Sequence, residues 1–282
     1  MPSRQLTVED LIDKDINEAF AKAQVRGKVG RPQWSTAPMD ESTILKLVRG
    51  TIGDGFCLSR SDPIIRFNLG KVTYGIQRTG GPDDREIGFI QFTQCSTPVE
   101  AEQAMKGYLS GYQRNLADVV QKSSVQLGSY CLQDCNSVFW IRDTVFVQVE
   151  SGSLSDDTAN LKIPHETILK IAQRLDQHLA QHSVAAEQQK KPHPELDTAN
   201  PFKVRRGETF NLKLKNLGDV HKSKRSQIDN PKLIIQLSNG TDEGAYPFIA
   251  RDVGMTKVKL MVAHKTTLAV GFKEVEVIVV DG

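Results

Sequence analysis

Four cysteines could form disulfides, stay free thiols or bind a metal ion, and all lie in the first half of the chain: Cys57, Cys95, Cys131 and Cys135. An even number fits two disulfides, for which three pairings exist. Reduced, buried thiols are the alternative, because the chain is not a small cysteine-dense scaffold. The Cys131–Cys135 spacing is C-x-x-x-C, and no second pair with metal-ligand spacing follows. Disulfides or free thiols are therefore preferred to a zinc site.

A pair of histidines, His178 and His182, falls at positions i and i+4 of a predicted helix, where two imidazoles can face one metal ion. A third ligand would have to come from His193 or Asp176, and no H-E-x-x-H motif frames the pair. Cationic residues near the C-terminal end of a helix also suit the helix dipole. We expect a solvated helix end and no bound cofactor, and keep His178 and His182 as the candidate metal ligands.

Motifs for nucleophilic or phosphate chemistry are missing from the sequence. Residues 50–55, Gly-Thr-Ile-Gly-Asp-Gly, are rich in glycine, but they follow a predicted helix and lack the Lys-Ser/Thr ending of a phosphate-binding loop. No G-x-S-x-G nucleophile elbow is present. We therefore name no catalytic residue.

Two features are candidates for binding. The segment His221, Lys222, Ser223, Lys224 and Arg225 lies between predicted strands, and as a basic loop it could hold an acidic partner or an anionic polymer. A solvated loop is the simpler alternative. Trp34 stands among prolines, and as an exposed aromatic residue it could contact a partner. The candidate binding residues are thus Trp34, His221, Lys222, Lys224 and Arg225.

The charge balance and the hydropathy exclude several classes of protein. The 282 residues include 36 Lys and Arg against 34 Asp and Glu, and a net charge of +2 is far from the basic balance of nucleic-acid-binding proteins. No segment approaches 18 consecutive apolar residues, so we expect no transmembrane segment. Acidic residues interrupt the N-terminal region, so the chain is either cytoplasmic or supplied without its export signal. Two disulfides would favour an extracytoplasmic or secreted protein, and free cysteines a cytoplasmic one.

Residues 1–182 are predicted to form an α+β domain with a helical N-terminal segment over residues 7–50. Asp40 is expected to start the second helix of that segment, and Thr97 with Glu100 predicts a capping box at the start of a long third helix. Turn residues and β-rich runs predict a hairpin of residues 64–77 with 87–94. They also predict a meander of three strands at 125–132, 138–142 and 145–150. A last helix is predicted at 164–182.

Residues 183–200 contain two prolines and almost no large apolar side chain, which predicts a linker. Residues 201–282 then alternate apolar and polar side chains, and no segment among them is typical of a helix. Alternation of this kind places one face of each strand in a core, so we expect an antiparallel β domain. It carries 14 Lys and Arg against 9 Asp and Glu, so it is mildly basic.

Three phrases of this last region resemble a bacterial-type immunoglobulin-like β-sandwich: Phe-Lys-Val-Arg-Arg-Gly-Glu-Thr-Phe at 202–210, Phe-Ile-Ala-Arg-Asp-Val-Gly-Met-Thr-Lys-Val-Lys-Leu at 248–260, and Val-Glu-Val-Ile-Val-Val at 275–280. The region has no cysteine or tryptophan, so only the general architecture carries over. The order of elements over residues 87–182 (99–116, 127–130, 138–149, 168–179) resembles the α+β extracytoplasmic regions of bacterial lipoproteins and receptor-kinase sensors. Both resemblances imply a protein that binds something outside the cell.

Together these patterns predict a two-domain, non-enzymatic binding or adaptor protein that acts by surface recognition, with a protein or an anionic surface as partner. One alternative is an enzyme whose site lies at the domain interface. Another is an inhibitor that presents the loops of the sandwich to a protease.

Overall fold

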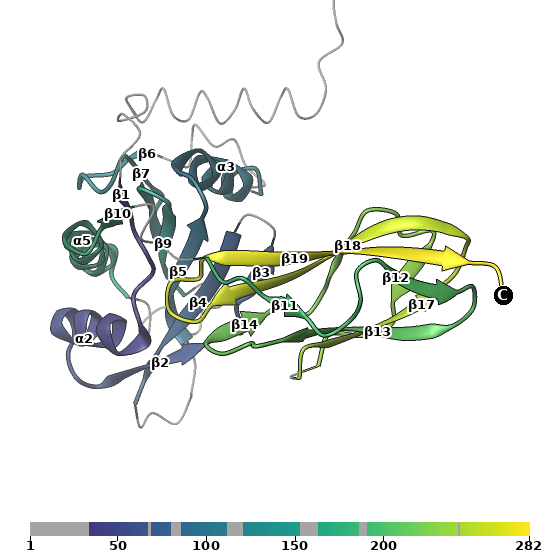
Figure 1. Ribbon diagram of the computed structural model, residues 1–282. Coiled ribbons are helices and arrows are strands. Elements are labelled where there is room, and N and C mark those ends of the chain that lie inside the picture. Colours follow the sequence, from purple (N-terminus) through teal and green to yellow (C-terminus); the bar gives the residue numbers. More distant parts are fainter. Residues whose placement is uncertain are drawn as a thin grey trace, which may run out of the picture. The chain divides into compact units, whose positions relative to one another are not determined.

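The computed structural model describes residues 34–66, 69–79, 86–111, 121–152, 163–185, 191–241 and 243–282 (Figure 1). Residues 7–33 of the predicted helical N-terminal segment and the turn of the predicted hairpin lie outside these ranges. The chain divides into two compact units. Unit 1 comprises Met1–Asp62 with Lys71–Gln189, and unit 2 comprises Pro63–Gly70 with Lys190–Gly282. The described part of the chain is rich in antiparallel strands and contains three helices.

Unit 1 is built on one large antiparallel sheet. Its strands follow the order β2-β4-β5-β9-β8-β7-β6. Their bounds are β2 Phe56–Arg60, β4 Leu69–Arg78, β5 Glu86–Cys95, β6 Gln121–Lys122, β7 Tyr130–Gln133, β8 Ser137–Arg142 and β9 Val145–Ser151. The predicted meander of three strands is confirmed as β7-β8-β9, whose neighbours pair antiparallel. The first of these strands begins five residues later than predicted, because Gly128 has a φ of 50° that interrupts extended structure.

Two of the three helices begin at the capping residues that the sequence indicates, and the third, α5, follows Pro164 without a side-chain cap. Helix α2 (Glu41–Ile52) follows Asp40, whose carboxylate accepts the amide of Thr43 at 2.9 Å. Helix α3 (Pro98–Leu109) has the predicted capping box between Thr97 and Glu100. Helix α5 (His165–Gln181) buries one stripe of side chains, Ile168, Ile171, Ala172, Leu175, Asp176 and Leu179. None of these helices combines the length and apolar character needed to cross a bilayer.

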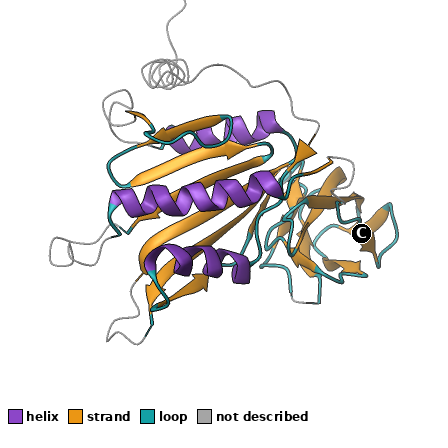
Figure 2. Cartoon of the chain, turned by 90° about the vertical axis from the view of Figure 1, so that its left-hand side faces the viewer, coloured by secondary structure: helices purple, strands orange, loops and turns teal. Residues whose placement is uncertain are grey.

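Helices lie on both faces of this sheet. Trp140 and Phe139 are successive residues of β8, so their side chains point to opposite faces. The Trp140 indole donates a hydrogen bond to Asp176 of α5, whereas the Phe139 ring packs edge-on against Tyr108 of α3 at 5.7 Å between centroids. Helix α5 therefore covers one face and α3 the other. In Figure 2 the longest helix, α5, crosses in front of the strands.

Unit 2 contains two further sheets, and no helix is found among its described residues. One sheet has the order β11-β13-β17-β16, and the other β12-β19-β18-β14 with β15 also pairing to β18. Their bounds are β11 Glu195–Leu196, β12 Phe202–Arg205, β13 Thr209–Lys215, β14 Val220–Lys222, β15 Gln227–Ile228, β16 Ile234–Gln236, β17 Ala245–Ala250, β18 Gly254–His264 and β19 Val270–Val280. Strands β12 and β19 pair parallel. Side chains of both sheets, Phe248 and Val277 among them, form one apolar core.

Two stretches differ from the sequence-based expectation. Residues 183–200, predicted as a linker, include β10 (Val184–Ala185), which pairs with β1 (Trp34–Ser35), and β11, which pairs with β13. Strands of two residues are too short to show an alternation that a sequence pattern can detect. The segment β3 (Ile64–Arg66), predicted as part of the hairpin, belongs to unit 2, where Ile65 packs in an apolar cluster with Met261 and Val270.

Candidate functional site

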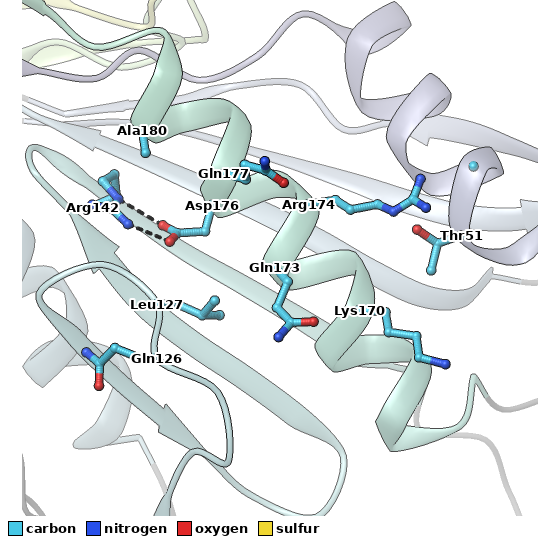
Figure 3. Close-up of a pocket in the computed structure, with 11 residues that line it drawn as sticks. Thr51, Gln126, Leu127, Arg142, Lys170, Gln173, Arg174, Asp176, Gln177 and Ala180 are labelled. Carbon is cyan, nitrogen blue, oxygen red and sulfur yellow. Dashed lines mark hydrogen bonds and ion pairs between the residues drawn. The ribbon is translucent and has the colours of Figure 1, made fainter.

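An open pocket of about 600 Å³ lies over the outward face of α5 in unit 1 (Figure 3). The lining residues come from the end of α2, the loop before β7, the end of β8 and about three turns of α5: Gly50, Thr51, Gln126, Leu127, Arg142, Lys170, Gln173, Arg174, Asp176, Gln177 and Ala180. We call this the α5 pocket. Its volume lies within the range of ligand-binding clefts.

Asp176, the one carboxylate among the described lining residues of the α5 pocket, is buried and fully occupied by hydrogen bonds. Its Oδ1 accepts the Trp140 indole N–H at 2.9 Å and Nε of Arg142 at 2.9 Å. Its Oδ2 accepts Nη2 of Arg142 at 2.5 Å and the backbone N–H of Gly128 at 3.2 Å. Only 5% of Asp176 is exposed. Each oxygen of this carboxylate accepts two donors, and the guanidinium of Arg142 balances its charge.

Local sequence explains why these groups meet. Trp140 and Arg142 are two residues apart on β8, so both point to the face that α5 covers. The backbone of Gly128 reaches Asp176 because a left-handed turn brings the loop against β8, where Ser129 donates to the carbonyl of Ile141 at 2.8 Å. A Cβ on Gly128 would lie 1.9 Å from that carbonyl oxygen. Glycine is therefore required at this position.

Arg142 remains charged at one end of the α5 pocket. Its hydrogen bonds to Asp176 raise the pKa of its guanidinium, and burial opposes them to a smaller extent. About a quarter of its side chain, 27%, stays exposed. Since Asp176 holds only Nε and Nη2, the remaining N–H groups of the guanidinium are free of that carboxylate and can donate toward the pocket.

Two further cations, Lys170 and Arg174, stand one helical turn apart on the exposed face of α5. Within the described ranges neither makes a hydrogen bond or an ion pair. Arg174 extends toward α2, where a Cβ on Gly50 would lie 2.5 Å from its Nη1. Like charges at i and i+4 disfavour a helix by a few tenths of a kcal/mol. With the charge of Asp176 balanced by Arg142, the pocket keeps two uncompensated positive charges.

The four cysteines form no disulfide, so of the two alternatives that the sequence left open, paired cysteines and free thiols, the structure has free thiols. Cys57 on β2 and Cys95 on β5 are separated by β4, and strands with one strand between them lie about 10 Å apart, too far for a disulfide. Cys131 is buried on β7, whereas Cys135 is exposed beyond its end. Burial raises the pKa of Cys95 to about 12 and that of Cys131 to about 11, so both stay protonated thiols.

His178 and His182 stack their rings at the end of α5, with centroids 3.9 Å apart and planes 18° apart. Burial, and next the neighbouring His182, lower the pKa of His178. Stacked rings turn their faces, not their nitrogen lone pairs, toward each other. Nowhere in the described ranges do three or more His, Cys, Asp or Glu side chains gather in a way that could hold a metal ion.

The basic segment at residues 221–225 is held in place, contrary to the loop expected from the sequence. His221 and Lys222 belong to β14, which pairs with β18. The Ser223 carbonyl accepts the hydroxyl of Tyr246 at 2.8 Å, and the Lys224 carbonyl accepts the side-chain amide of Gln236 at 3.0 Å. Lys224 and Arg225 remain exposed. For Trp34 the structure describes only the backbone, in β1, so the side chain cannot be assigned to a site.

A smaller pocket of about 250 Å³ lies in unit 2, and it includes Asn200, Lys257, Glu274 and Glu276. Lys257 Nζ is 2.8 Å from a Glu274 oxygen, and Asn200 accepts the backbone N–H of Glu276 at 3.0 Å. These groups satisfy one another, which leaves the α5 pocket as the better candidate site.

Sequence reasoning missed most of the α5 pocket. It named Asp176 only as a possible third metal ligand and did not single out Arg142, Lys170 or Arg174. One signal was present: Asp176 falls on the apolar stripe of its helix, next to Leu175, and a carboxylate there needs buried donors.

Comparison with models of known protein families gives no match, and comparison with curated proteins gives no significant similarity.

Proposed function

We propose that the chain is a non-enzymatic recognition protein and that the α5 pocket of unit 1 binds an anionic partner. One observation carries the proposal: Lys170 and Arg174 are exposed and uncompensated, while the only carboxylate among the described residues of the pocket is bonded to Arg142, Trp140 and Gly128. An anion brought near them gains attraction without displacing an internal partner.

The same geometry supports binding in preference to catalysis. A general base needs a lone pair free to take a proton, and both oxygens of Asp176 already accept two donors. A nucleophilic cysteine needs a lowered pKa, whereas burial raises the pKa of both Cys95 and Cys131.

For unit 2 we propose an immunoglobulin-like sandwich that follows an α+β unit 1 and serves as a spacer or presenting module. The support is the pair of sheets that share one apolar core. We also propose a cytoplasmic location. Two disulfides would have favoured an extracytoplasmic protein, whereas four free cysteines favour a reducing compartment.

Calorimetric titration with three anionic polymers, polyglutamate, polyphosphate and sulfated dextran, tests the proposed function. The variant K170Q/R174Q removes the two free charges of the pocket. The matched control K203Q/R205Q removes the same charge from exposed positions of β12 in unit 2. We expect at least one polymer to bind the wild type and the control, with affinity about tenfold lower for K170Q/R174Q. No binding at all, or equal binding by both variants, would contradict the proposal.

A further inference from the structure

We propose, as an inference that rests on this function, that the occupant of the α5 pocket is an extended acidic peptide segment with carboxylates at alternate positions. Three features of the pocket lead to this choice: the spacing of its cations, the chemistry of its glutamines and its length along the helix.

The spacing of the two free cations matches a β-like chain. Lys170 and Arg174 are four residues apart, so their Cα atoms are about 6 Å apart along the helix axis. In an extended peptide, side chains at i and i+2 point to the same side and are about 6.6 Å apart. A Glu-x-Glu or Asp-x-Asp sequence laid along α5 therefore presents one carboxylate to each cation. Adjacent acidic residues would point to opposite sides, and only one could reach.

Three glutamines line the same pocket: Gln126 before β7, and Gln173 and Gln177 on α5. All three are exposed, and within the described ranges none of their side-chain amides is engaged in a hydrogen bond. A primary amide offers both a donor and an acceptor, as a peptide group does. A peptide backbone can therefore pair with both, whereas phosphate and sulfate esters are acceptors and use only the N–H groups. The glutamines thus favour a peptide over the other polyanions.

The length of the lining sets the size of the segment. On α5 the lining runs from Lys170 to Ala180, which is about 15 Å along the helix axis. An extended chain of about five residues covers that distance. A short linear segment of a partner protein is thus sufficient, and no folded surface has to enter the pocket.

Two fluorescent pentapeptides of equal composition test the spacing directly: Ser-Glu-Ser-Glu-Ser and Ser-Glu-Glu-Ser-Ser. Fluorescence anisotropy at low ionic strength measures their affinities for the full chain. The peptide with adjacent glutamates can form only one of the two exposed ion pairs. We therefore expect it to bind about fivefold more weakly than the peptide with alternating glutamates. Equal affinities would overturn the inference.

The variant Q173A/Q177A tests the glutamines without a change of charge, and Q181A, an exposed glutamine of α5 outside the pocket, is its control. We expect Q173A/Q177A to weaken the alternating peptide more than polyphosphate, because the peptide loses both donor and acceptor partners whereas polyphosphate loses only donors, with Q181A like the wild type. If polyphosphate binds the wild type and the peptides do not, the peptide inference is wrong and the anion-binding function stands. If no anion binds, both are wrong.

Discussion

The carboxylate of Asp176 on α5 accepts two hydrogen bonds from the guanidinium of Arg142 on β8, one at Nε and one at Nη2. This bidentate pair joins the helix to the sheet and also aligns the guanidinium at the end of the α5 pocket. An ion pair between a buried carboxylate and a partly buried guanidinium is costly to break, because one charge is then left without compensation. The pair therefore links the stability of unit 1 to the shape of its candidate site.

The D176N variant should lose about 3 kcal/mol of unfolding free energy, because Arg142 then keeps its charge without a counter-ion. Urea titration followed by tryptophan fluorescence measures this for unit 1, which holds both tryptophans of the chain. The double variant R142Q/D176N should recover part of the loss. D54N, a change at an exposed aspartate, should stay within about 0.5 kcal/mol of the wild type. A D176N protein as stable as D54N would show that the pair contributes nothing.

Replacement of Gly128 by alanine should destabilise unit 1 by about 2 kcal/mol or more, since the new Cβ meets the Ile141 carbonyl and φ is 50°. Gly107 in α3 offers a matched control of opposite sign. A Cβ at that position has no atom within 4 Å, so G107A should stabilise the helix by about 0.5–1 kcal/mol. Equal effects of G128A and G107A in the same urea assay would contradict this description of the loop.

The stacked histidines predict a decline of stability in acid. Burial lowers the pKa of His178 in the folded state from its ordinary value of 6.5. The second ring, His182, lowers this pKa further, and the Asp40 carboxylate at the start of α2 raises it in part. The unfolded chain then takes up the proton first, so this contribution is complete above pH 6.5 and is lost as the pH falls below it. Unfolding free energies between about pH 7.5 and about pH 5 should fall less steeply in H178Q than in the wild type or in H193Q. Parallel curves for all three proteins would rule the effect out.

Thiol reactivity should follow burial. Cys135 is exposed and should react with iodoacetamide in the native protein, whereas Cys95 and Cys131, with pKa values of about 12 and about 11, should react only after unfolding. Cys57 is half-buried and should react at an intermediate rate. Intact mass without reduction and peptide mapping of the labelled protein measure both points. A mass that shows a disulfide would contradict the structure at these positions.

Local signals predicted the local structure well. Asp40 and the Thr97–Glu100 capping box marked where helices begin because a capping side chain bonds to a backbone only three residues away. The β7-β8-β9 meander was predictable for the same reason, since its strands are joined by short turns. By contrast, β5 pairs with β9 although 49 residues lie between the two strands, a partner that no local pattern selects.

The candidate site could not be assembled from sequence for a related reason. Arg142 and Asp176 are 34 residues apart and meet only because α5 packs on β8. The even number of cysteines suggested disulfides, although strand order keeps Cys57 and Cys95 on strands that are not neighbours. The basic run at 221–225 was a candidate binding segment because its charges are adjacent in sequence. The cations of the α5 pocket, Lys170 and Arg174, are four residues apart in sequence and become neighbours only on a helix.

The most direct test of anion binding at the α5 pocket compares the two basic regions in one titration. Polyglutamate is added at low ionic strength to the wild type, to K170Q/R174Q in unit 1 and to K222Q/R225Q in the basic segment of unit 2. The account predicts that K170Q/R174Q lowers the affinity about tenfold and that K222Q/R225Q leaves it nearly unchanged. A loss of binding in K222Q/R225Q with wild-type affinity in K170Q/R174Q would contradict it and place the site in unit 2.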